Sequence, residues 1–460
     1  MTLWTASDAA AATGGRVTAD WAATGISIDT RTIRPGDLFV ALSAARDGHD
    51  FVTAALARGA AAALVSRVPD GVPADAPLLI VDDVTAALES LGRAGRARLR
   101  GRVLAITGSV GKTSTKDMAA AALAGQGRVH AAEASLNNHW GVPLTLARMP
   151  ADTDFAIIEI GMNHPGEIAP LARIARPHVA MITTVAAAHL EAFADIQGIA
   201  REKAAIFAGL EPMGSAILPE DLDVTPILRD GADAAGAVVV GFGASGAARP
   251  VSVTPDGDGT QVRARVLGET VDFHLASMGA HFVMNAVGVL AALVQLGADL
   301  GASARGLAGW RPYHGRGAVE RLGPITLLDD SYNANPASLA AGLATLERLP
   351  PGRRVAILGD MLELGPDEMT IHQQIASWPV MGGISLVHAC GPRMRAMFDA
   401  LAVEKQGIWA ETADGLIDRA DALIQPGDVV FVKGSKSSRV AAVVDALRKT
   451  WHRPAPDTKG

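Results

Sequence analysis

The chain has 460 residues, of which 49% are apolar and 19% charged, and its formal net charge is −7 at pH 7. This length exceeds one ordinary hydrophobic core and predicts about two to four soluble domains. The acidic balance argues against a nucleic-acid partner, and the single Cys390 excludes an intramolecular disulfide framework and a multi-cysteine metal site.

The first block, residues 1–83, holds short elements and predicts a small α/β domain. Segment 27–42 has the pattern of a strand, a turn and a second strand, and segment 55–66 that of a helix followed by a strand. The Asp29-Thr30-Arg31 loop offers polar groups suited to an anionic or sugar ligand, although ordinary turns have the same composition. Thr30 and Arg31 are therefore candidate substrate contacts.

The second block, residues 84–312, predicts a mostly parallel sheet wrapped by helices. Apolar runs that alternate with helical segments lie at 103–107, 155–160, 179–184 and 238–242. Segment 250–275 is different, because it alternates and carries an Asp-Gly-Asp-Gly turn. It predicts antiparallel strands added to the central sheet.

A linker at 312–317 precedes the third block, 313–460. Candidate strands at 325–329, 354–358, 384–389 and 428–432 alternate with helices that begin near Pro336, Asp367, Pro392 and Lys436. This order predicts a Rossmann-like domain. The fold class is thus α/β throughout, in three domains.

Nothing in the sequence indicates secretion or membrane insertion. The first ten residues do not have the charged and then apolar layout of a signal peptide. The most apolar window, 282–298, contains two amide side chains and is short for a membrane span, so it predicts a buried helix. We therefore expect a cytoplasmic protein.

The segment VLAITGSVGKTST, residues 103–115, predicts a phosphate-binding loop between a buried strand and a helix. Its glycines let the backbone approach phosphate oxygens, Lys112 supplies a positive charge, and the Thr113 hydroxyl is a ligand for Mg²⁺. Ile106 replaces the first glycine of the usual GxxxxGK[ST] pattern, but the flanking strand and helix favour nucleotide binding over a chance turn. The candidate nucleotide contacts are Gly108, Ser109, Gly111, Lys112, Thr113 and Ser114.

Polar residues follow other strands of the predicted central sheet. Glu159 ends an apolar strand, where it can hold Mg²⁺ or form a surface salt bridge, and the phosphate loop favours the metal. His189 also follows a strand and is equally a structural or a metal-binding residue. Lys203 falls in a helical pattern and, on residue chemistry alone, is expected to be a solvated lysine.

Three more residues stand near the predicted domain junction. Asn285, at the start of the apolar helix, can either read an adenine edge or pack against a neighbouring backbone. Arg316, in the linker, is either a plain hinge residue or a ligand for the terminal phosphate. Asp330 belongs to the dense polar loop DDSYNANP, and further polar groups near Asp360 and Lys433 end strands of the same predicted sheet.

Nine motifs in order resemble the Mur ligase family, and within it the MurF branch, over nearly the whole chain. They are DTRTIRPGDLFVAL, TGSVGKTSTK, SLNNHWGVPLTL, EIGMNHPGEI, AAHLEAF, the GxHxxxN segment, DDSYNANP, GDMLELG and KGSKSSR. The MurF branch comprises ATP-dependent ligases that join D-alanyl-D-alanine to UDP-N-acetylmuramoyl-tripeptide. The resemblance implies that activity, through an acyl phosphate, in a protein expected to be a monomer with small-molecule substrates.

The resemblance also assigns roles to residues. It implies two Mg²⁺ ions and a CO₂-derived carbamate on Lys203. It also implies that the first domain binds the UDP end of the substrate, the second binds ATP, and the third closes over the site. The implied metal ligands are Thr113, Glu159, His189 and Lys203. The implied nucleotide contacts include Lys112, Asn285, Arg316 and Asp330, and the implied substrate loop holds Asn137, Asn138 and Thr145.

Two departures and two alternatives qualify this resemblance. Phe282 stands where relatives usually carry Asn, and Ala194-Asp195 replaces a common Gly-Ser. The near alternative is a MurE-type ligase, which adds a diamino acid to UDP-MurNAc-dipeptide, but its Asp-Asn-Pro-Arg-type motif is not found. The alternative from a different class is a nucleotide-gated switch that hydrolyses ATP without ligation. Whether the tripeptide ends in meso-diaminopimelate or lysine is left open by the sequence.

Overall fold

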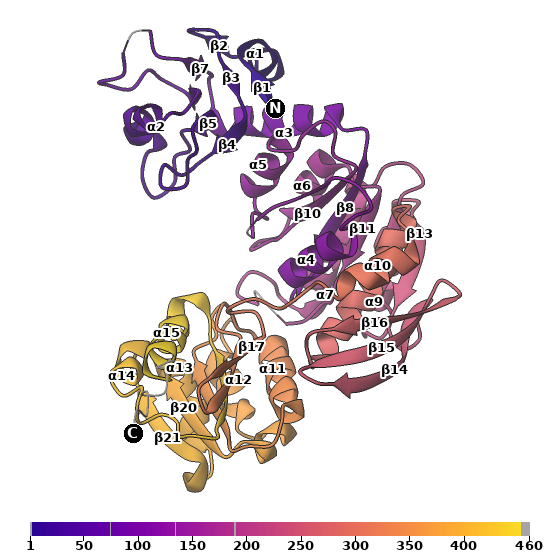
Figure 1. Cartoon of the computed structure of the whole chain (residues 1–460), viewed down its shortest axis with the longest axis vertical. Coiled ribbons are helices and arrows are strands. Elements are labelled where there is room, and N and C mark those ends of the chain that lie inside the picture. The colour runs from indigo at the N-terminus through magenta and orange to yellow at the C-terminus, as the bar shows by residue number, and fades with distance from the viewer. Residues whose placement is uncertain (1, 74, 134, 188–189, 452–460) are drawn as a thin grey trace, which may run out of the picture.

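The computed structural model describes residues 2–73, 75–133, 135–187 and 190–451. Figure 1 shows three lobes that follow one another along the chain, from the N-terminal lobe at the top to the C-terminal lobe at the bottom. Each lobe is built on its own main sheet, of five, nine and six strands. The predicted three-domain α/β architecture is confirmed, while the boundaries at 83/84 and 312/313 stay predictions. Within the described ranges, no helix is long and apolar enough to cross a membrane.

The N-terminal lobe has a five-stranded sheet in the order β2-β7-β6-β5-β4, in which only the β2–β7 pair is antiparallel. A separate pair, β1 and β3, lies beside α1. The elements are β1 (Trp4–Thr5), α1 (Ala6–Thr13), β2 (Arg16–Val17), β3 (Ala22–Ala23), β4 (Gly25–Ser27), β5 (Asp37–Val40), α2 (Val52–Ala57), β6 (Ala62–Val65) and β7 (Leu78–Ile80).

The central sheet has the order β16-β15-β14-β13-β12-β11-β8-β10-β9, and its strands run parallel from β9 to β14. The hairpins β14–β15 and β15–β16 are antiparallel, as the sequence predicted for this segment. The strands are β8 (Arg102–Thr107), β9 (Val129–Ala131), β10 (Phe155–Glu159), β11 (Val179–Ile182), β12 (Ser215–Pro219), β13 (Val238–Phe242), β14 (Ala248–Asp256), β15 (Gly259–Val266) and β16 (Glu269–Leu275). The helices are α3 (Val84–Arg98), α4 (Lys112–Ala122), α5 (Gly141–Ala147), α6 (Ile168–Ala175), α7 (Ile196–Ala204), α8 (Thr225–Ala234), α9 (Ala280–Gln295) and α10 (Leu300–Leu307).

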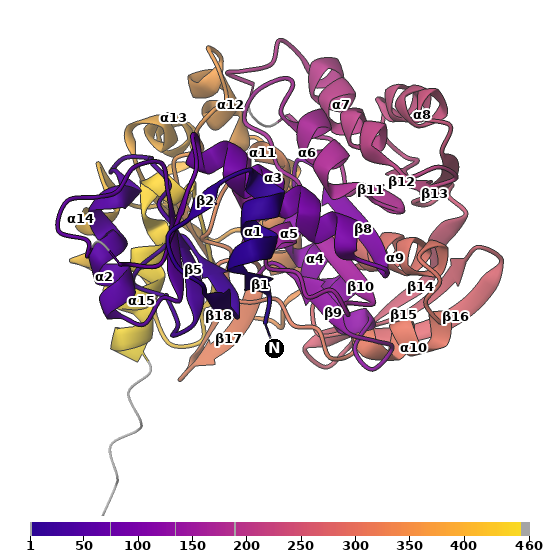
Figure 2. The same ribbon diagram turned by 90° about the horizontal axis from the view of Figure 1, so that it is seen from above.

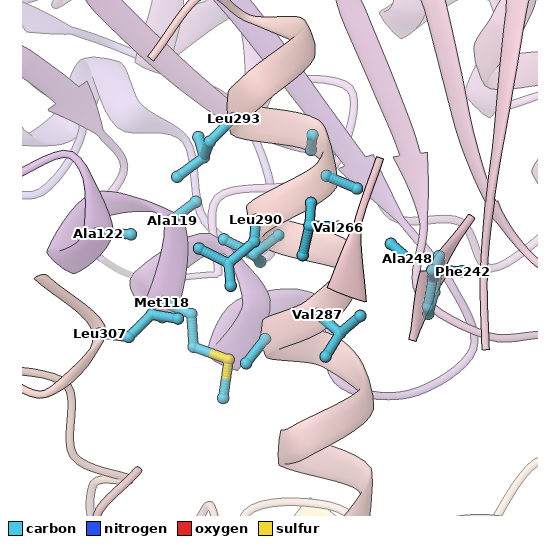
Figure 3. Close-up of a cluster of buried hydrophobic side chains, with 14 of the residues drawn as sticks. Met118, Ala119, Ala122, Phe242, Ala248, Val266, Val287, Leu290, Leu293 and Leu307 are labelled. Atoms are coloured by element: carbon cyan, nitrogen blue, oxygen red, sulfur yellow. The ribbon is translucent and has the colours of Figure 1, made fainter. Parts of the chain in front are cut away.

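Helix α9 is the centre of the largest core cluster (Figure 3). Val287, Leu290 and Leu293 are fully buried, and α9 packs against both α4 and the sheet. A helix that is apolar all round is stable only when it is covered on every side. Burial of each such side chain contributes about 1.5–3 kcal/mol, so the core fixes the position of the helix whose second turn carries Asn285.

Helices α3 and α5 cross closely because α3 has glycines at the contact. A Cβ on Gly92 would lie 2.9 Å from the Pro143 carbonyl oxygen, and one on Gly95 would collide with the Leu146 carbonyl oxygen. The two backbones therefore approach each other without intervening side chains. This crossing holds α5, which directly follows the loop of Asn137 and Asn138.

The N-terminal lobe is fastened to the same two helices. The Trp4 indole donates to the Ala147 carbonyl at 2.9 Å, and Arg98 of α3 donates to the Leu3 carbonyl at 2.7 Å. Arg148, at the end of α5, donates to the Ile26 carbonyl at 2.7 Å. Figure 2 shows α1 beside α3. Backbone carbonyls of one lobe thus accept from side chains of the other.

The C-terminal sheet has the order β17-β18-β22-β19-β20-β21 and is parallel except for the β17–β18 pair. Helices α11, α12 and α13 cover one face, and α14 and α15 cover the other, so the Rossmann-like prediction is confirmed. The elements are β17 (Ala318–Leu322), β18 (Ile325–Asp329), α11 (Pro336–Arg348), β19 (Arg354–Gly359), α12 (Glu368–Ile375), β20 (Leu386–Cys390), α13 (Pro392–Ala400), β21 (Gln406–Ala410), α14 (Ala413–Ile417), β22 (Val429–Lys433) and α15 (Val440–Trp451).

Candidate active site

A cavity of about 650 Å³ lies between the central and C-terminal lobes. Its central wall contains the phosphate loop, Glu159 and the start of α9, and its opposite wall contains the linker, Asp330 and Lys433. Both walls are built from carboxyl ends of parallel strands, where open α/β sheets bind their ligands.

The phosphate loop is held in shape by its glycines. Gly111 has φ 84° and caps α4, and a Cβ there would lie 2.7 Å from the Asn285 Nδ2 atom. A Cβ on Gly108 would collide with the Thr183 hydroxyl. The Ser109 amide donates to the Thr184 carbonyl at 2.9 Å, which ties the loop to the end of β11. The first amides of α4, including that of Ser114, therefore face the cavity as an anion-binding end.

Lys112 folds back over this loop, and its Nζ donates to the Gly108 carbonyl at 2.7 Å. Burial lowers the pKa of Lys112, while the nearby Glu159 carboxylate opposes that change and Arg316 adds to it. An incoming phosphate would strengthen the charged form, since it adds negative charge beside the ammonium group.

Glu159 provides an oxygen that is ready for a cation. The residue is 1% exposed, and its Oε1 accepts from the Asn137 amide at 2.7 Å. Its Oε2 has no hydrogen-bond partner in the part of the chain that the structure describes. The Thr113 hydroxyl lies 3.1 Å from the Ser135 hydroxyl at the same wall. Carboxylate and hydroxyl oxygens are the donors that Mg²⁺ prefers, so the residues present fit this ion.

Lys203 is buried, and its expected solvent exposure was wrong. It lies on α7, is 1% exposed, and its Nζ has no hydrogen-bond partner among the described residues. Burial lowers its pKa well below the usual lysine value, and the positive charge of Lys112 lowers it further. Ile199 and Phe207, one helical turn before and after it, are both buried. That spacing was the signal for a buried face.

His189 lies outside the described residues. The loop beside it reaches the C-terminal lobe, because the Glu191 amide donates to the Glu363 carbonyl at 3.4 Å. The substituted pair Ala194-Asp195 is followed by α7, and the Asp195 carboxylate caps this helix by accepting from the Gly198 amide at 2.6 Å. The aspartate therefore has a defined structural role here.

Arg316 brings the linker to the phosphate loop. Its guanidinium donates to the Ser135 hydroxyl at 2.8 Å and stacks 3.9 Å from the centre of the Tyr332 ring. Asp330 lies beside it on the same wall but is paired with Lys433, at 2.5 Å. The structure thus brings Thr113, Ser135 and Arg316 together from two lobes.

The first two turns of α9 form another part of the wall. Asn285 is 7% exposed and lies against the phosphate loop, so the amide packs on a backbone and also lines the cavity. Phe282 is buried, with its ring 5.0 Å from that of Trp310 in an edge-to-face arrangement. Phe282 therefore makes an apolar contact at the position where the resemblance to the family implies Asn.

The other candidate substrate residues are less closely grouped. Asn138 lines the cavity, but its Oδ1 accepts from the Gly141 amide at 2.9 Å. Thr145 is buried in α5, where its hydroxyl donates to the Gly141 carbonyl at 2.8 Å. Thr30 and Arg31 lie in the N-terminal lobe, and Arg31 is paired with Asp29 at 2.6 Å. The structure does not bring these last three residues to the cavity.

Family comparisons cover all three lobes. The model described as "Mur ligase middle domain" matches residues 106–293, "Mur ligase, glutamate ligase domain" matches 315–436, and "Mur ligase family, catalytic domain" matches 22–96. The UDP-N-acetylmuramoyl-tripeptide–D-alanyl-D-alanine ligase of Escherichia coli (strain K12) is 38% identical, over 92% of this chain and 93% of that protein. The chain belongs to the Mur ligase family.

Solved structures agree with this assignment. A crystal structure of MurF from Acinetobacter baumannii has a TM-score of 0.86 at 29% identity, and the match covers 97% of this chain and 99% of that one. The MurF ligase of Thermotoga maritima, solved in complex with ADP, has a TM-score of 0.78 at 25% identity and covers 92% and 97% of the two chains. Members of the family are ATP-dependent ligases, and this chain is an enzyme of that kind.

Sequence reasoning missed three residues in the site of this Mur ligase: Ser135, Thr183 and Tyr332. Each is polar or aromatic and lies in a loop, and each becomes important only through partners far along the chain. Ser135 and Tyr332 were visible within the motifs SLNNHWGVPLTL and DDSYNANP, but their contacts with Arg316 were not. No spacing rule connects such loop residues, because loops have no fixed period.

The polar residues around Asp360 in this Mur ligase also have structural roles. A smaller cavity of about 200 Å³ lies there, lined by Asp360, Gly391 and Arg439 among others. The Asp360 carboxylate accepts from the Met394 amide at 2.7 Å at the start of α13. This carboxylate is therefore largely used as a helix cap.

Proposed function

We propose that this enzyme joins D-alanyl-D-alanine to UDP-N-acetylmuramoyl-tripeptide and hydrolyses ATP to ADP and phosphate in doing so. The observation that carries the proposal is the single cavity where Lys112, Glu159 and Arg316 meet. Relatives named for this reaction match the chain from end to end, which supports the same substrates. The product would be the UDP-MurNAc-pentapeptide precursor of peptidoglycan.

In this proposal the phosphates of ATP lie on the amide end of α4, with the ammonium group of Lys112 beside them. The adenine lies toward Asn285, which is held against Gly111 by the buried helix α9. Arg316 reaches the terminal phosphate from the C-terminal lobe, where it already lies 2.8 Å from Ser135. Asp330 supports the linker side through its pair with Lys433.

Thr113, Glu159 and His189 would hold Mg²⁺, together with a carbamate on Lys203. When bound, Mg²⁺ neutralises charge on the phosphate oxygens. Lys203 suits carbamate formation, since a buried amine with a lowered pKa is held in the neutral form that attacks CO₂. The carbamate would convert an amine that has no partner among the described residues into an anionic oxygen ligand. Two ions and this modification belong to the proposal.

The reaction then needs two displacements. The terminal carboxylate of the tripeptide attacks the γ-phosphorus, and the bond to the ADP oxygen breaks to give an acyl phosphate. The amine of the dipeptide attacks the acyl carbon, loses a proton, and expels inorganic phosphate. Lys112 and Arg316 balance charge on the transferred group, and the opposing walls of the cavity keep water from the acyl phosphate.

The remaining parts of the proposal concern location and assembly. The acidic chain, with no spanning helix in its described ranges, fits a cytoplasmic enzyme that acts on small molecules. We propose that it acts as a monomer, without nucleic acid or membrane insertion, because one chain supplies both walls of the cavity.

The test is phosphate release from ATP with UDP-MurNAc-tripeptide, comparing D-alanyl-D-alanine, single amino acids and no acceptor. We expect release only with D-alanyl-D-alanine, and a UDP-pentapeptide product by mass spectrometry. Release that requires a diamino acid and UDP-MurNAc-dipeptide would identify a MurE-type ligase instead. Phosphate release that does not depend on the acceptor would indicate a nucleotide hydrolase without ligase activity.

A further inference from the structure

The linker that carries Arg316 is tied to the phosphate-loop helix. The Tyr313 hydroxyl donates a short hydrogen bond to the Asp117 carboxylate of α4. The other oxygen of Asp117 lies 3.1 Å from the buried Lys116 amine, which donates to the Ala132 carbonyl. Burial and the Asp117 carboxylate raise the pKa of Tyr313, so the phenol keeps its proton and remains a donor.

The next residue of the linker is tied to the opposite lobe. Arg448, on α15, donates to His314 Nδ1 at 2.7 Å, to Glu320 at 2.6 Å and to Asp329 at 2.8 Å. His314, Glu320 and Asp329 have the ligand types of a metal site, but the cation among them is this guanidinium. Asp329 is 2% exposed, which makes the pair with Arg448 less screened than a surface pair.

Arg316 lies directly after these two ties. Its amide donates to the Tyr313 carbonyl at 2.9 Å and closes a turn, and the Tyr332 amide donates to the Gly315 carbonyl at 2.9 Å. The backbone is thereby fixed, while the side chain extends to Ser135 on the central wall. Neither Tyr313 nor Arg448 is among the residues that line the cavity, so both act on the site indirectly.

We propose that Tyr313 and Arg448 are positioning residues. Tyr313 anchors the linker to Asp117 of the central lobe, and Arg448 holds His314 of the linker from the C-terminal lobe. The two contacts together direct Arg316 toward the terminal phosphate of ATP. The role of Arg316 rests on the proposed function, whereas the two ties stand on geometry alone. Removal of either tie should loosen the linker and displace the guanidinium from its position beside Ser135. Such a displacement costs rate, because the cation must face charge as it develops.

The experiment is a double-mutant cycle on the full-length enzyme. Tyr313→Phe and Arg448→Gln are each measured alone and combined with Arg316→Gln. We expect each single variant to lower kcat about tenfold in the wild-type background, and less than twofold when Arg316 is already absent. An unchanged kcat, or an equal loss in both backgrounds, would overturn the proposal.

Two further measurements make the outcome specific. Arg395→Gln is the control, since Arg395 is another helical arginine with a carboxylate partner, Asp399, in the same lobe, and it should leave kcat unchanged. Calorimetric titration without any acceptor should show weaker ATP binding and unchanged ADP binding in Tyr313→Phe. If the wild-type enzyme does not ligate the dipeptide, the proposed function is wrong. The nucleotide titration still tests the positioning role of Tyr313 in that case. Equal changes in ATP and ADP affinity would reject that role.

Discussion

The carboxyl edges of the central and C-terminal sheets contain similar residue types but satisfy them differently. At the central edge, Glu159 Oε2 and Lys203 Nζ are buried without a hydrogen-bond partner among the described residues. At the C-terminal edge, Lys433 is paired with Asp330, and Asp360 accepts from the first amides of α13. The charged groups named at the first edge require a ligand to complete them, whereas those named at the second edge are paired within the protein. At the second edge, only the Ser435 hydroxyl is buried without a hydrogen-bond partner among the described residues. A buried group without a partner costs stability, so its presence favours a role in function.

The largest expected effect is at the central edge. Lys112→Ala should lower ligase activity about a thousandfold or more, because the phosphoryl group loses its cation. The fold should remain, since Lys112 makes a local contact with Gly108. Initial rates and thermal unfolding measure the two effects, and Lys449→Ala, at an exposed lysine of α15, is the control. If the Lys112→Ala enzyme kept its ligase activity, Lys112 would not be required for phosphoryl transfer, and the contrast between the central and C-terminal edges would fail.

Lys203 and Lys116 are both fully buried and give a matched pair. Lys203→Met should lower activity about a hundredfold yet raise the free energy of unfolding by about 1 kcal/mol, because it removes an amine without a partner. Lys116→Met should instead lower that free energy by about 2 kcal/mol, since Lys116 donates to the Ala132 carbonyl and faces Asp117. Denaturant unfolding in metal-free buffer measures both. Destabilisation of the same size by each substitution would mean that Lys203 also has a structural partner.

At the C-terminal edge, a substitution should cost stability. Lys433→Met should lower the free energy of unfolding by about 2 kcal/mol, because it leaves the Asp330 carboxylate without its cation in a mostly buried position. The double variant with Asp330→Asn should recover part of this loss. Denaturant unfolding is again the measurement, and an unchanged midpoint would show that this edge is not self-sufficient.

A further expected effect concerns stability in acid, below pH 6.5. Burial lowers the pKa of His178 to about 4, helped by the positive charges of Arg96 and Arg102, and its Nδ1 accepts from the Val103 amide. Between pH 6.5 and about 4, His178 is protonated in the unfolded chain but neutral in the folded chain. The free energy of unfolding should therefore fall as the pH drops through this range. His178→Gln should flatten the decline, and His139→Gln, at an exposed histidine, should not. Equal pH profiles for both variants would assign the decline to other groups.

The main strands and the phosphate loop could be predicted from sequence because they depend on local pattern. Apolar runs fixed β8, β10, β11 and β13 to within a few residues. The strands β9 and β12 were missed, since β9 has three half-buried residues and β12 ends in proline. An edge strand of three residues such as β9 has little periodicity to detect, and a proline argues against a strand in the interior of a sheet.

The site was less predictable, because its geometry depends on long-range contacts. The bond between Arg316 and Ser135 joins residues 181 positions apart, and no local pattern encodes it. Lys203 shows the opposite case, in which the buried neighbours Ile199 and Phe207 signalled burial but lysine is usually exposed. The resemblance to known ligases drew attention to Lys203 where residue chemistry alone did not.

The close crossing of α3 and α5 has a consequence for protein engineering. Replacing helical glycine with alanine is a common way to stabilise a protein, worth about 0.5–1 kcal/mol at a compatible site. At Gly92 and Gly95 the added methyl group would meet the backbone of α5. The displaced helix would shift the adjoining loop of Asn137, which orients Glu159. A library designed for heat resistance should therefore keep both glycines, since a more helical α3 would give a less active ligase.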